Sequence, residues 1–152
     1  MDIGALVPNF TLPDETGTPR SLGKFLAHGP VVLFFYPAAM SGGCTKEACH
    51  FRDLGAEFRA ADAQRVGISP DAPDKQRTFS ERHGFDYPLL SDPEGKVARI
   101  FDAHRSWGPL QAKRKTFVIG TDFRLIDSIK SEVNMNAHAD RALAALGRSA
   151  KA

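Results

Sequence analysis

Apolar residues along the chain follow two spacings, one typical of strands and the other typical of helices. The run Val31–Phe35 is continuously apolar and combines β-branched with aromatic residues, which indicates a strand covered on both faces in a parallel sheet. Within Cys44–Ala63, apolar residues return every three or four positions at Phe51, Leu54 and Phe58. That spacing predicts one amphipathic helix with a single buried stripe.

The remaining elements are shorter and alternate in type. Extended segments are predicted at Asn9–Leu12, Arg65–Ser69, Tyr87–Leu90, Thr116–Ile119 and Leu125–Ile129, the last two joined as a hairpin by Gly120–Asp122. Helices are predicted at Ser21–Ala27, Lys75–His83 ended by Gly84, Lys96–Phe101, and Ala137–Leu146 closed by Gly147. This order predicts an α/β protein of thioredoxin-like fold, with a central mixed β-sheet flanked by helices on both faces. We expect a single domain over residues 1–152.

Length and charge narrow the class of protein. A chain of 152 residues can bury a core without disulfides or metals. Its 20 Lys and Arg against 18 Asp and Glu leave a formal charge of +2, which favours neither nucleic acid nor anionic lipid as a partner. The longest apolar run, from Val31 to Met40, is interrupted by Pro37 and reaches about half the length of a membrane span. The N-terminus lacks the pattern of a secretory signal, so we expect a cytoplasmic protein with no membrane partner.

The two cysteines, Cys44 and Cys49, lie too close in sequence to act as a structural staple, because closing so short a loop constrains the unfolded chain little. Such a pair in a reducing compartment is typical of catalysis, redox sensing or metal binding. Cys44 follows Gly42 and Gly43, which allow a tight turn, and it opens the predicted helix. Unpaired backbone N–H groups and the helix dipole there favour a thiolate. Alternatively, Cys44 is an ordinary buried cysteine and Ser41 only caps the helix.

A metal site is a further alternative for this region, since His50 follows Cys49 directly. Structural zinc needs four ligands, usually supplied as two pairs, and no second pair exists in the sequence. The other histidines are scattered along the chain. We therefore expect no metal and no cofactor.

The stretch Phe35–Cys49 resembles the active-site region of peroxiredoxins, specifically the bacterioferritin-comigratory or PrxQ subfamily. The family pattern is a proline, three residues, a threonine or serine, two residues and then the peroxidatic cysteine, and Pro37, Ser41 and Cys44 fit it. A second cysteine often follows five positions later, where this chain has Cys49. Further similarities run along nearly the whole chain, at residues 10–14, 67–71, 89–92 and 114–119.

The resemblance implies a thiol-dependent peroxidase that reduces hydrogen peroxide and organic hydroperoxides. By this resemblance, Cys44 is the nucleophile, Pro37 shields its sulfur and Ser41 forms a hydrogen bond with the peroxide. Attack of a thiolate on one peroxide oxygen builds negative charge on the other, so donors must face the leaving oxygen. Ser41 stands where the subfamily usually has threonine, and Gly42 where it often has proline, which predicts a more flexible loop.

Two charged residues complete the set that the resemblance implies. Arg114 is the active-site arginine, with an exposed position in the basic cluster Lys113–Lys115 as the alternative. Glu47, one turn beyond Cys44, orients Arg114 through a bidentate pair. Alternatively, Glu47 is a surface carboxylate in the first helical turn.

By the same resemblance, Cys49 resolves the Cys44 sulfenic acid as an intramolecular disulfide, which thioredoxin or another thiol reductant then reduces. Five helical steps place the two Cα atoms about 8.6 Å apart. Disulfides seldom form beyond about 7 Å, so the first turn or two must unwind on oxidation. Alternatively, Cys49 is a core residue and an external thiol resolves Cys44. Two cysteines in one helix require no second subunit, so we expect a monomer or a weak homodimer.

Two rival functions share the predicted fold. A disulfide oxidoreductase would carry Cys-x-x-Cys, and the four residues between Cys44 and Cys49 fit that motif poorly. A redox-sensing or chaperone-like protein would use the same cysteines with peroxide only as a signal.

Overall fold

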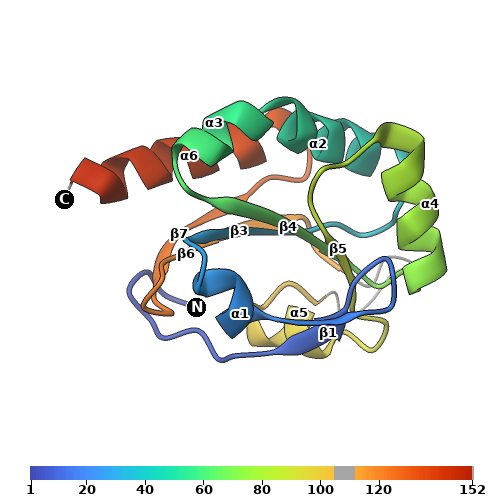
Figure 1. The fold of residues 1–152 in the computed structure, drawn as a ribbon, viewed down its shortest axis with the longest axis horizontal. Coiled ribbons are helices and arrows are strands. Elements are labelled where there is room, and N and C mark those ends of the chain that lie inside the picture. The colour runs from blue at the N-terminus through green and yellow to red at the C-terminus, as the bar shows by residue number, and fades with distance from the viewer. Residues whose placement is uncertain (105–111, 152) are drawn as a thin grey trace.

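A computed structural model describes residues 1–104 and 112–151, and its centre is a five-stranded mixed sheet. The strands are β3 (Val31–Phe35), β4 (Gln64–Ser69), β5 (Leu89–Ser91), β6 (Lys115–Ile119) and β7 (Leu125–Lys130). They lie in the order β5-β4-β3-β6-β7 (Figure 1), with β3 parallel to β4, β4 parallel to β5, and the β3–β6 and β6–β7 pairs antiparallel. The predicted mixed sheet is confirmed.

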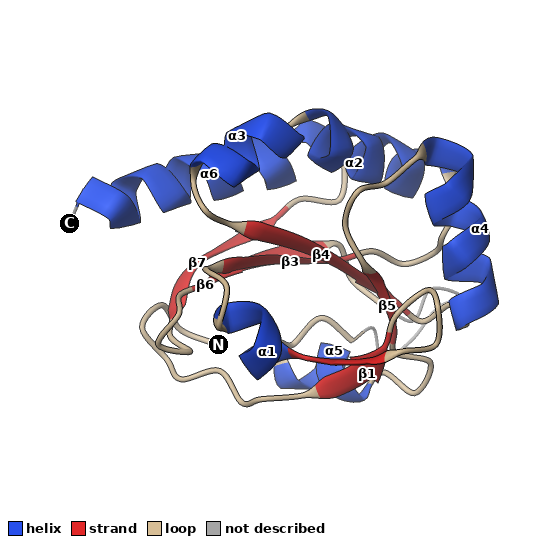
Figure 2. Cartoon of the chain, in the orientation of Figure 1, coloured by secondary structure: helices blue, strands red, loops and turns tan. Residues whose placement is uncertain are grey.

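Helices cover both faces of this sheet (Figure 2), as the sequence predicts. One face carries α2 (Gly42–Asp53), α3 (Gly55–Ala60), α4 (Pro73–His83) and α6 (Met135–Lys151). The other carries α1 (Leu22–Leu26), α5 (Lys96–Ile100) and a small antiparallel sheet of β1 (Thr11–Pro13) and β2 (Pro19–Ser21). The sequence did not predict β2.

Strand β3 joins the two hydrophobic cores that lie on opposite faces of the sheet. Val31, Leu33 and Phe35 belong to the core beneath α1 and α5. Val32 and Phe34 belong to the core beneath α2, α3 and α6, as alternation along a strand requires. All five side chains are fully buried, which explains why this strand is apolar at every position.

The single helix predicted over Cys44–Ala63 is wrong, because the chain forms two helices separated at Leu54, whose φ of −93° and ψ of 17° leave the helical region. The guanidinium of Arg65, on β4, donates to the carbonyl oxygen of Phe51 at 2.9 Å. In a continuous helix that carbonyl would accept from the N–H of Gly55. A side chain from the sheet therefore occupies the acceptor that the helix would need to continue.

The predicted limits of the C-terminal helix are also wrong. The helix begins earlier, at Met135, where the Asn134 side chain accepts from the N–H of Ala137 at 3.2 Å. It then runs through Gly147 to Lys151. A glycine inside a helix costs only about 1 kcal/mol relative to alanine, so Gly147 does not end this helix.

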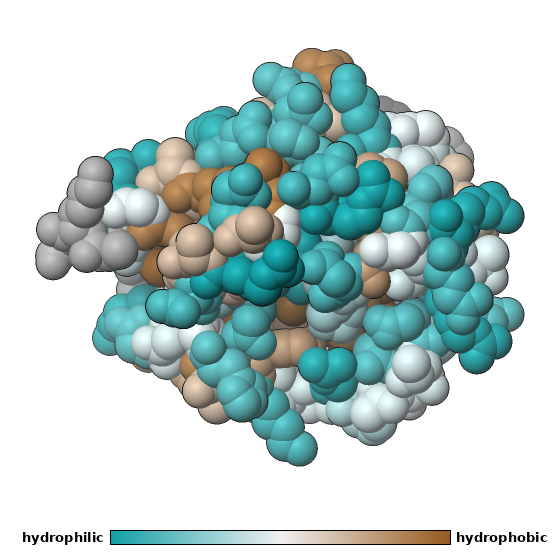
Figure 3. All heavy atoms as spheres, turned by 45° about the horizontal axis from the view of Figure 1, so that its top comes forward, coloured by the Kyte–Doolittle hydropathy of each residue, from teal (hydrophilic) through white to brown (hydrophobic). Residues whose placement is uncertain are grey.

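The surface of this face is mainly polar. Figure 3 brings the layer of α2, α3 and α6 towards the viewer and shows apolar atoms only in small patches among hydrophilic ones. In the part of the chain that the structure describes, no helix has the length and apolar character needed to cross a bilayer.

Candidate active site

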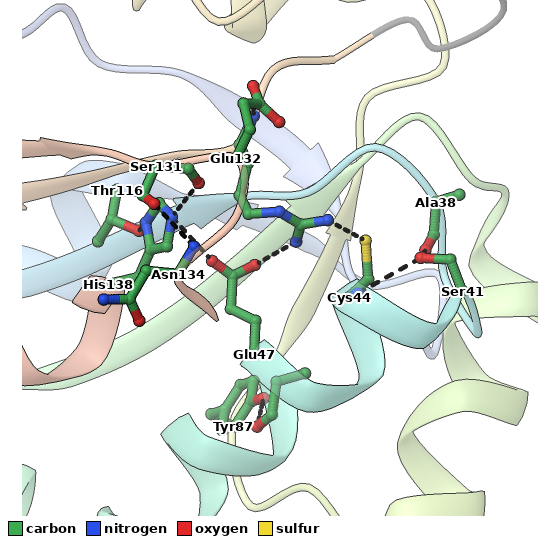
Figure 4. A network of polar contacts seen from close by, with 12 residues as sticks. Ala38, Ser41, Cys44, Glu47, Tyr87, Thr116, Ser131, Glu132, Asn134 and His138 are labelled. Carbon is green, nitrogen blue, oxygen red and sulfur yellow. Dashed lines mark hydrogen bonds and ion pairs between the residues drawn. The ribbon is translucent and has the colours of Figure 1, made fainter. Parts of the chain in front are cut away.

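Cys44 lies in the first turn of α2, three residues after the N-cap (Figure 4). Ser41 is the N-cap, and its hydroxyl oxygen accepts a long hydrogen bond of 3.4 Å from the N–H of Cys44. The same hydroxyl donates to the carbonyl of Ala38 at 2.9 Å. Gly42 and Gly43 are helical residues rather than the tight turn that their sequence suggested. Cys44 is 1% exposed, so its sulfur lies at a buried helix N-terminus.

Arg114 lies directly against this sulfur. Its Nη2 donates to Cys44 Sγ at 3.3 Å, and its Nη1 donates to Glu47 Oε1 at 3.0 Å. Arg114 is only 6% exposed, so it is not a solvated member of the basic cluster. Burial alone would lower the pKa of Arg114, but the adjacent Glu47 and Cys44 raise it overall, and the guanidinium stays charged.

The close approach of Arg114 to α2 depends on a glycine. A Cβ atom at Gly43 would lie 3.2 Å from Arg114 Nη2, tighter than ordinary van der Waals contact. Gly42, by contrast, faces open space. The two glycines that look equivalent in the sequence therefore differ, and only Gly43 makes room for the arginine.

Glu47 is fully buried, so it is not the surface carboxylate of the alternative interpretation. Its contact with Arg114 uses one oxygen, because the second guanidinium nitrogen is directed to the sulfur instead. Burial raises the pKa of Glu47 to about 8, although Arg114 acts in the opposite direction. Glu47 Oε2 has no hydrogen-bond partner among the described residues.

A histidine from the C-terminal helix lies beside Glu47 Oε2, the oxygen that does not contact Arg114 (Figure 4). His138 Nε2 lies 3.5 Å from Glu47 Oε2 and donates to the carbonyl of Ser131 at 2.8 Å. Its Nδ1 accepts from the hydroxyl of Thr116 at 2.7 Å. Burial lowers the pKa of His138, so the ring is neutral. Sequence reasoning missed these residues, and the one available signal was Thr116, a polar position in an apolar strand.

The loop before α2 is tied to the neighbouring strand by Asp71. The Asp71 carboxylate accepts from the N–H of Ala39 at 2.6 Å and from the Ser69 hydroxyl at 2.7 Å. Met40 has a φ of 66°, a left-handed conformation that side chains seldom adopt. Pro37 is half-buried at the start of this loop. The loop is therefore held in a strained form by contacts outside it.

Cys49 lies on the same helix as Cys44 but is half-buried, and both cysteines are free. Burial raises the pKa of Cys49, which favours its thiol form. The helix is intact between the two residues. The structure thus brings Ser41, Cys44, Glu47 and Arg114 together, while Cys49 is five positions further along α2.

The described residues offer little to a metal ion. His50 Nε2 pairs with the carboxylate of Asp140 on α6 at 2.7 Å rather than with the cysteines. Over residues 1–104 and 112–151, no three His, Cys, Asp or Glu side chains gather as a metal site would require.

Comparison with known proteins identifies the family of this chain. The model of the AhpC/TSA family matches residues 3–128. A Mycobacterium tuberculosis protein assigned as a peroxiredoxin is 59% identical over 148 residues, covering 96% of each chain.

Two solved structures are similar over nearly the full length. The crystal structure of peroxidoxin BcpB from Mycobacterium tuberculosis has a TM-score of 0.93 at 58% identity, covering 97% of both chains. Peroxiredoxin Q from Xanthomonas campestris has a TM-score of 0.84 at 32% identity, covering 93% of this chain and 91% of that one.

Proposed function

Because the chain belongs to the AhpC/TSA family, within the bacterioferritin-comigratory or PrxQ peroxiredoxins of thioredoxin-like fold, we propose that Cys44 is the nucleophile of a thiol-dependent peroxidase. The family supports peroxidase chemistry with a thiol reductant. The observation that carries the residue assignment is the 3.3 Å contact between Arg114 Nη2 and Cys44 Sγ at the buried start of α2.

The first step is attack of the Cys44 thiolate on one oxygen of the hydroperoxide. The O–O bond breaks, the sulfur becomes a sulfenic acid, and the other oxygen leaves as an alkoxide or hydroxide that takes a proton from water. Arg114 already donates to the sulfur and has fixed N–H groups to face the growing charge on the leaving oxygen. Pro37, at the start of the same loop, shields the sulfur.

Ser41 has a specific part in this geometry. Its only hydroxyl proton is given to the carbonyl of Ala38, and one lone pair accepts from the N–H of Cys44. A second lone pair is left to accept from the O–H of the peroxide. In the folded site the Ser41 hydroxyl therefore accepts a hydrogen bond from the substrate. It can donate one to the substrate only after its bond to the Ala38 carbonyl breaks.

The second step is resolution by Cys49. The Cys49 thiol attacks the sulfenic sulfur, water leaves, and an intramolecular disulfide forms. The intact helix keeps the two residues too far apart, so the first turn of α2 must unwind. Thioredoxin or another thiol reductant then restores both thiols, and one domain over residues 1–152 completes the cycle as a monomer or weak homodimer.

The substrate assignment draws on a structural relative. A structure of the Xanthomonas campestris bacterioferritin comigratory protein, 32% identical to this chain, is described in terms of its alkyl peroxide reduction activity. We propose that this chain likewise accepts organic hydroperoxides as well as hydrogen peroxide. The buried, largely apolar surroundings of Cys44 suit an alkyl group.

Stopped-flow oxidation followed by mass spectrometry tests the proposal. We expect fast second-order loss of the Cys44 thiolate with peroxide, and then a Cys44–Cys49 disulfide after one equivalent. Cys49→Ser should react at the same first rate and retain a sulfenic acid. A wild-type rate in Cys44→Ser would contradict the peroxidase assignment, and a disulfide-free sulfenic acid in the unaltered protein would contradict resolution by Cys49.

A further inference from the structure

Two acidic groups share one buried cation in the proposed active site. Cys44 Sγ and Glu47 Oε1 accept from the two terminal nitrogens of the same guanidinium, Arg114. The exposed fractions of these three residues are 1%, 0% and 6%. If both acids were ionised, one negative charge would remain uncompensated in a region shielded from water, which is strongly unfavourable.

The groups around Glu47 add no second positive charge. Those facing it are Cys44 on its own helix, Tyr87 before β5, Arg114 before β6, Glu132 after β7, and His138 on α6. Within the described residues, Arg114 is the only cation of this set. Burial lowers the pKa of His138 and the charge of Arg114 acts in the same direction, so the ring is neutral even though its hydrogen bond to the Ser131 carbonyl raises the pKa. Glu132 is acidic and disfavours a further negative charge on Glu47.

The second oxygen of Glu47 points to the same conclusion. Glu47 Oε2 is buried and accepts no hydrogen bond in the part of the chain described. His138 Nε2 lies 3.5 Å away, but its proton is directed to the Ser131 carbonyl. A buried carboxylate oxygen without a donor costs more free energy than a buried neutral carboxyl group.

We propose that Glu47 carries a proton while Cys44 is a thiolate, so that Arg114 neutralises the sulfur alone. Burial raises the pKa of Glu47 to about 8, in agreement with this geometry. A neutral Glu47 still accepts from Arg114 Nη1 through Oε1, so it positions the guanidinium without competing for its charge. This inference rests on the proposed function of Cys44 as the nucleophile and adds the charge state of its neighbour.

The charge state matters because negative charge grows on the leaving peroxide oxygen beside Arg114. An ionised Glu47 would neutralise the guanidinium and repel that charge. The rate of peroxide reduction should therefore fall as Glu47 ionises at alkaline pH, although the thiolate remains.

Infrared spectroscopy of the reduced protein tests the proposal without any turnover. At neutral pH we expect a carbonyl stretch of a protonated carboxylic acid that is absent in Glu47→Gln and disappears as the pH rises. A matched control is Glu15→Gln, because Glu15 is a half-buried carboxylate that accepts from the Leu89 N–H at 3.2 Å, far along the chain from Cys44. This control should retain the band. A neutral-pH spectrum identical in wild type and Glu47→Gln would overturn the proposal.

Stopped-flow rates provide the second arm. A glutamine imitates the protonated side chain and cannot ionise, so the second-order rate of Glu47→Gln with peroxide should lose the alkaline decline that the wild type shows. An alkaline decline in Glu47→Gln equal to that of the wild type, with an unchanged unfolding midpoint, would show that another group causes it and would overturn the proposal. If Glu47→Gln does not fold, the pH dependence of the wild-type infrared band still decides the question. A wild-type protein that consumes no peroxide would contradict the proposed function and leave the infrared result standing.

Discussion

The two ends of helix α2 are held in different ways. At its start, the N–H of Cys44 has one long bond of 3.4 Å to the cap, after a loop whose Met40 lies in the left-handed region. At its far end, the ring of Phe51 stacks on Phe34 with centroids 4.2 Å apart, and Tyr87 donates to the carbonyl of Ala48 at 2.7 Å. The backbone cap at the start is weak, and Cys44 is held there by the contact of its sulfur with Arg114, whereas the far end is anchored by packing in the aromatic core.

This difference suits the proposed chemistry, because each cysteine occupies one of the two regions. Cys44 must leave its folded position after oxidation, whereas Cys49 must stay where Cys44 can reach it. A helix with a weak backbone cap at its start and a packed far end lets the first turn unwind, once the contact between Cys44 and Arg114 is lost, while the core beneath the far end stays closed. Local stability is therefore distributed along α2 in the way that the resolving step requires.

Removing the anchor should have the largest effect on stability. Phe51→Ala takes a fully buried ring out of the aromatic core, and we expect it to lower the free energy of unfolding by about 3–5 kcal/mol. Urea unfolding of the reduced protein measures this loss. A change below about 1 kcal/mol would mean that the far end of α2 is not anchored by this ring.

At the start of the helix, the largest effect should appear in the rate. Arg114→Met removes the donor at 3.3 Å from the sulfur, and we expect the second-order rate with peroxide to fall by about 100-fold to 1000-fold. Lys113→Met is the matched control from the same basic cluster, and its rate should stay close to wild type. Equal losses in both variants would assign the effect to general charge rather than to the contact with Cys44.

The pH dependence of stability should also come from the region of Cys44. Burial raises the pKa of Glu47 from its ordinary 4.5 to about 8, so the folded protein binds more protons than the unfolded chain between these values. This contribution to the free energy of unfolding is complete below about pH 4.5 and is lost as pH rises through about 8.

His138 contributes a slope of the opposite sign, because burial lowers its pKa. The comparison of wild type with Glu47→Gln therefore isolates the glutamate. Urea unfolding at pH 5 and pH 8 should show a smaller pH-dependent loss in Glu47→Gln than in wild type. Parallel curves for the two proteins would contradict burial of an ionisable Glu47.

The smallest effects come from removing a single hydroxyl group at each end. Ser41→Ala removes the cap and Tyr87→Phe removes the bond to the Ala48 carbonyl, and each should cost about 1 kcal/mol. Their kinetic consequences should differ. Ser41→Ala should speed disulfide formation in the second stopped-flow phase because it loosens the first turn, whereas Tyr87→Phe should leave that phase unchanged. Similar acceleration by both would show that the two ends open together.

Local patterns predicted most of the fold because the decisive information lies within short windows. The continuous apolar run of β3 and the left-handed Gly84 that ends α4 are examples. The break at Leu54 could not be predicted, because it depends on a hydrogen bond from Arg65, which folding brings from another element. In the candidate site, family similarity identified Cys44 and Arg114. His138, which lies 3.5 Å from Glu47 Oε2, comes from a helix far along the chain, with no local signal.

Amide hydrogen exchange of α2, compared between the reduced protein and the disulfide form, tests the difference between the two ends most directly. In the disulfide form, amides from Thr45 to Ala48 should lose protection, because their carbonyl partners lie in the first turn. Amides from Phe51 to Leu54 should keep the protection that they have in the reduced protein. Unchanged protection along all of α2, or its loss at both ends together, would contradict the account.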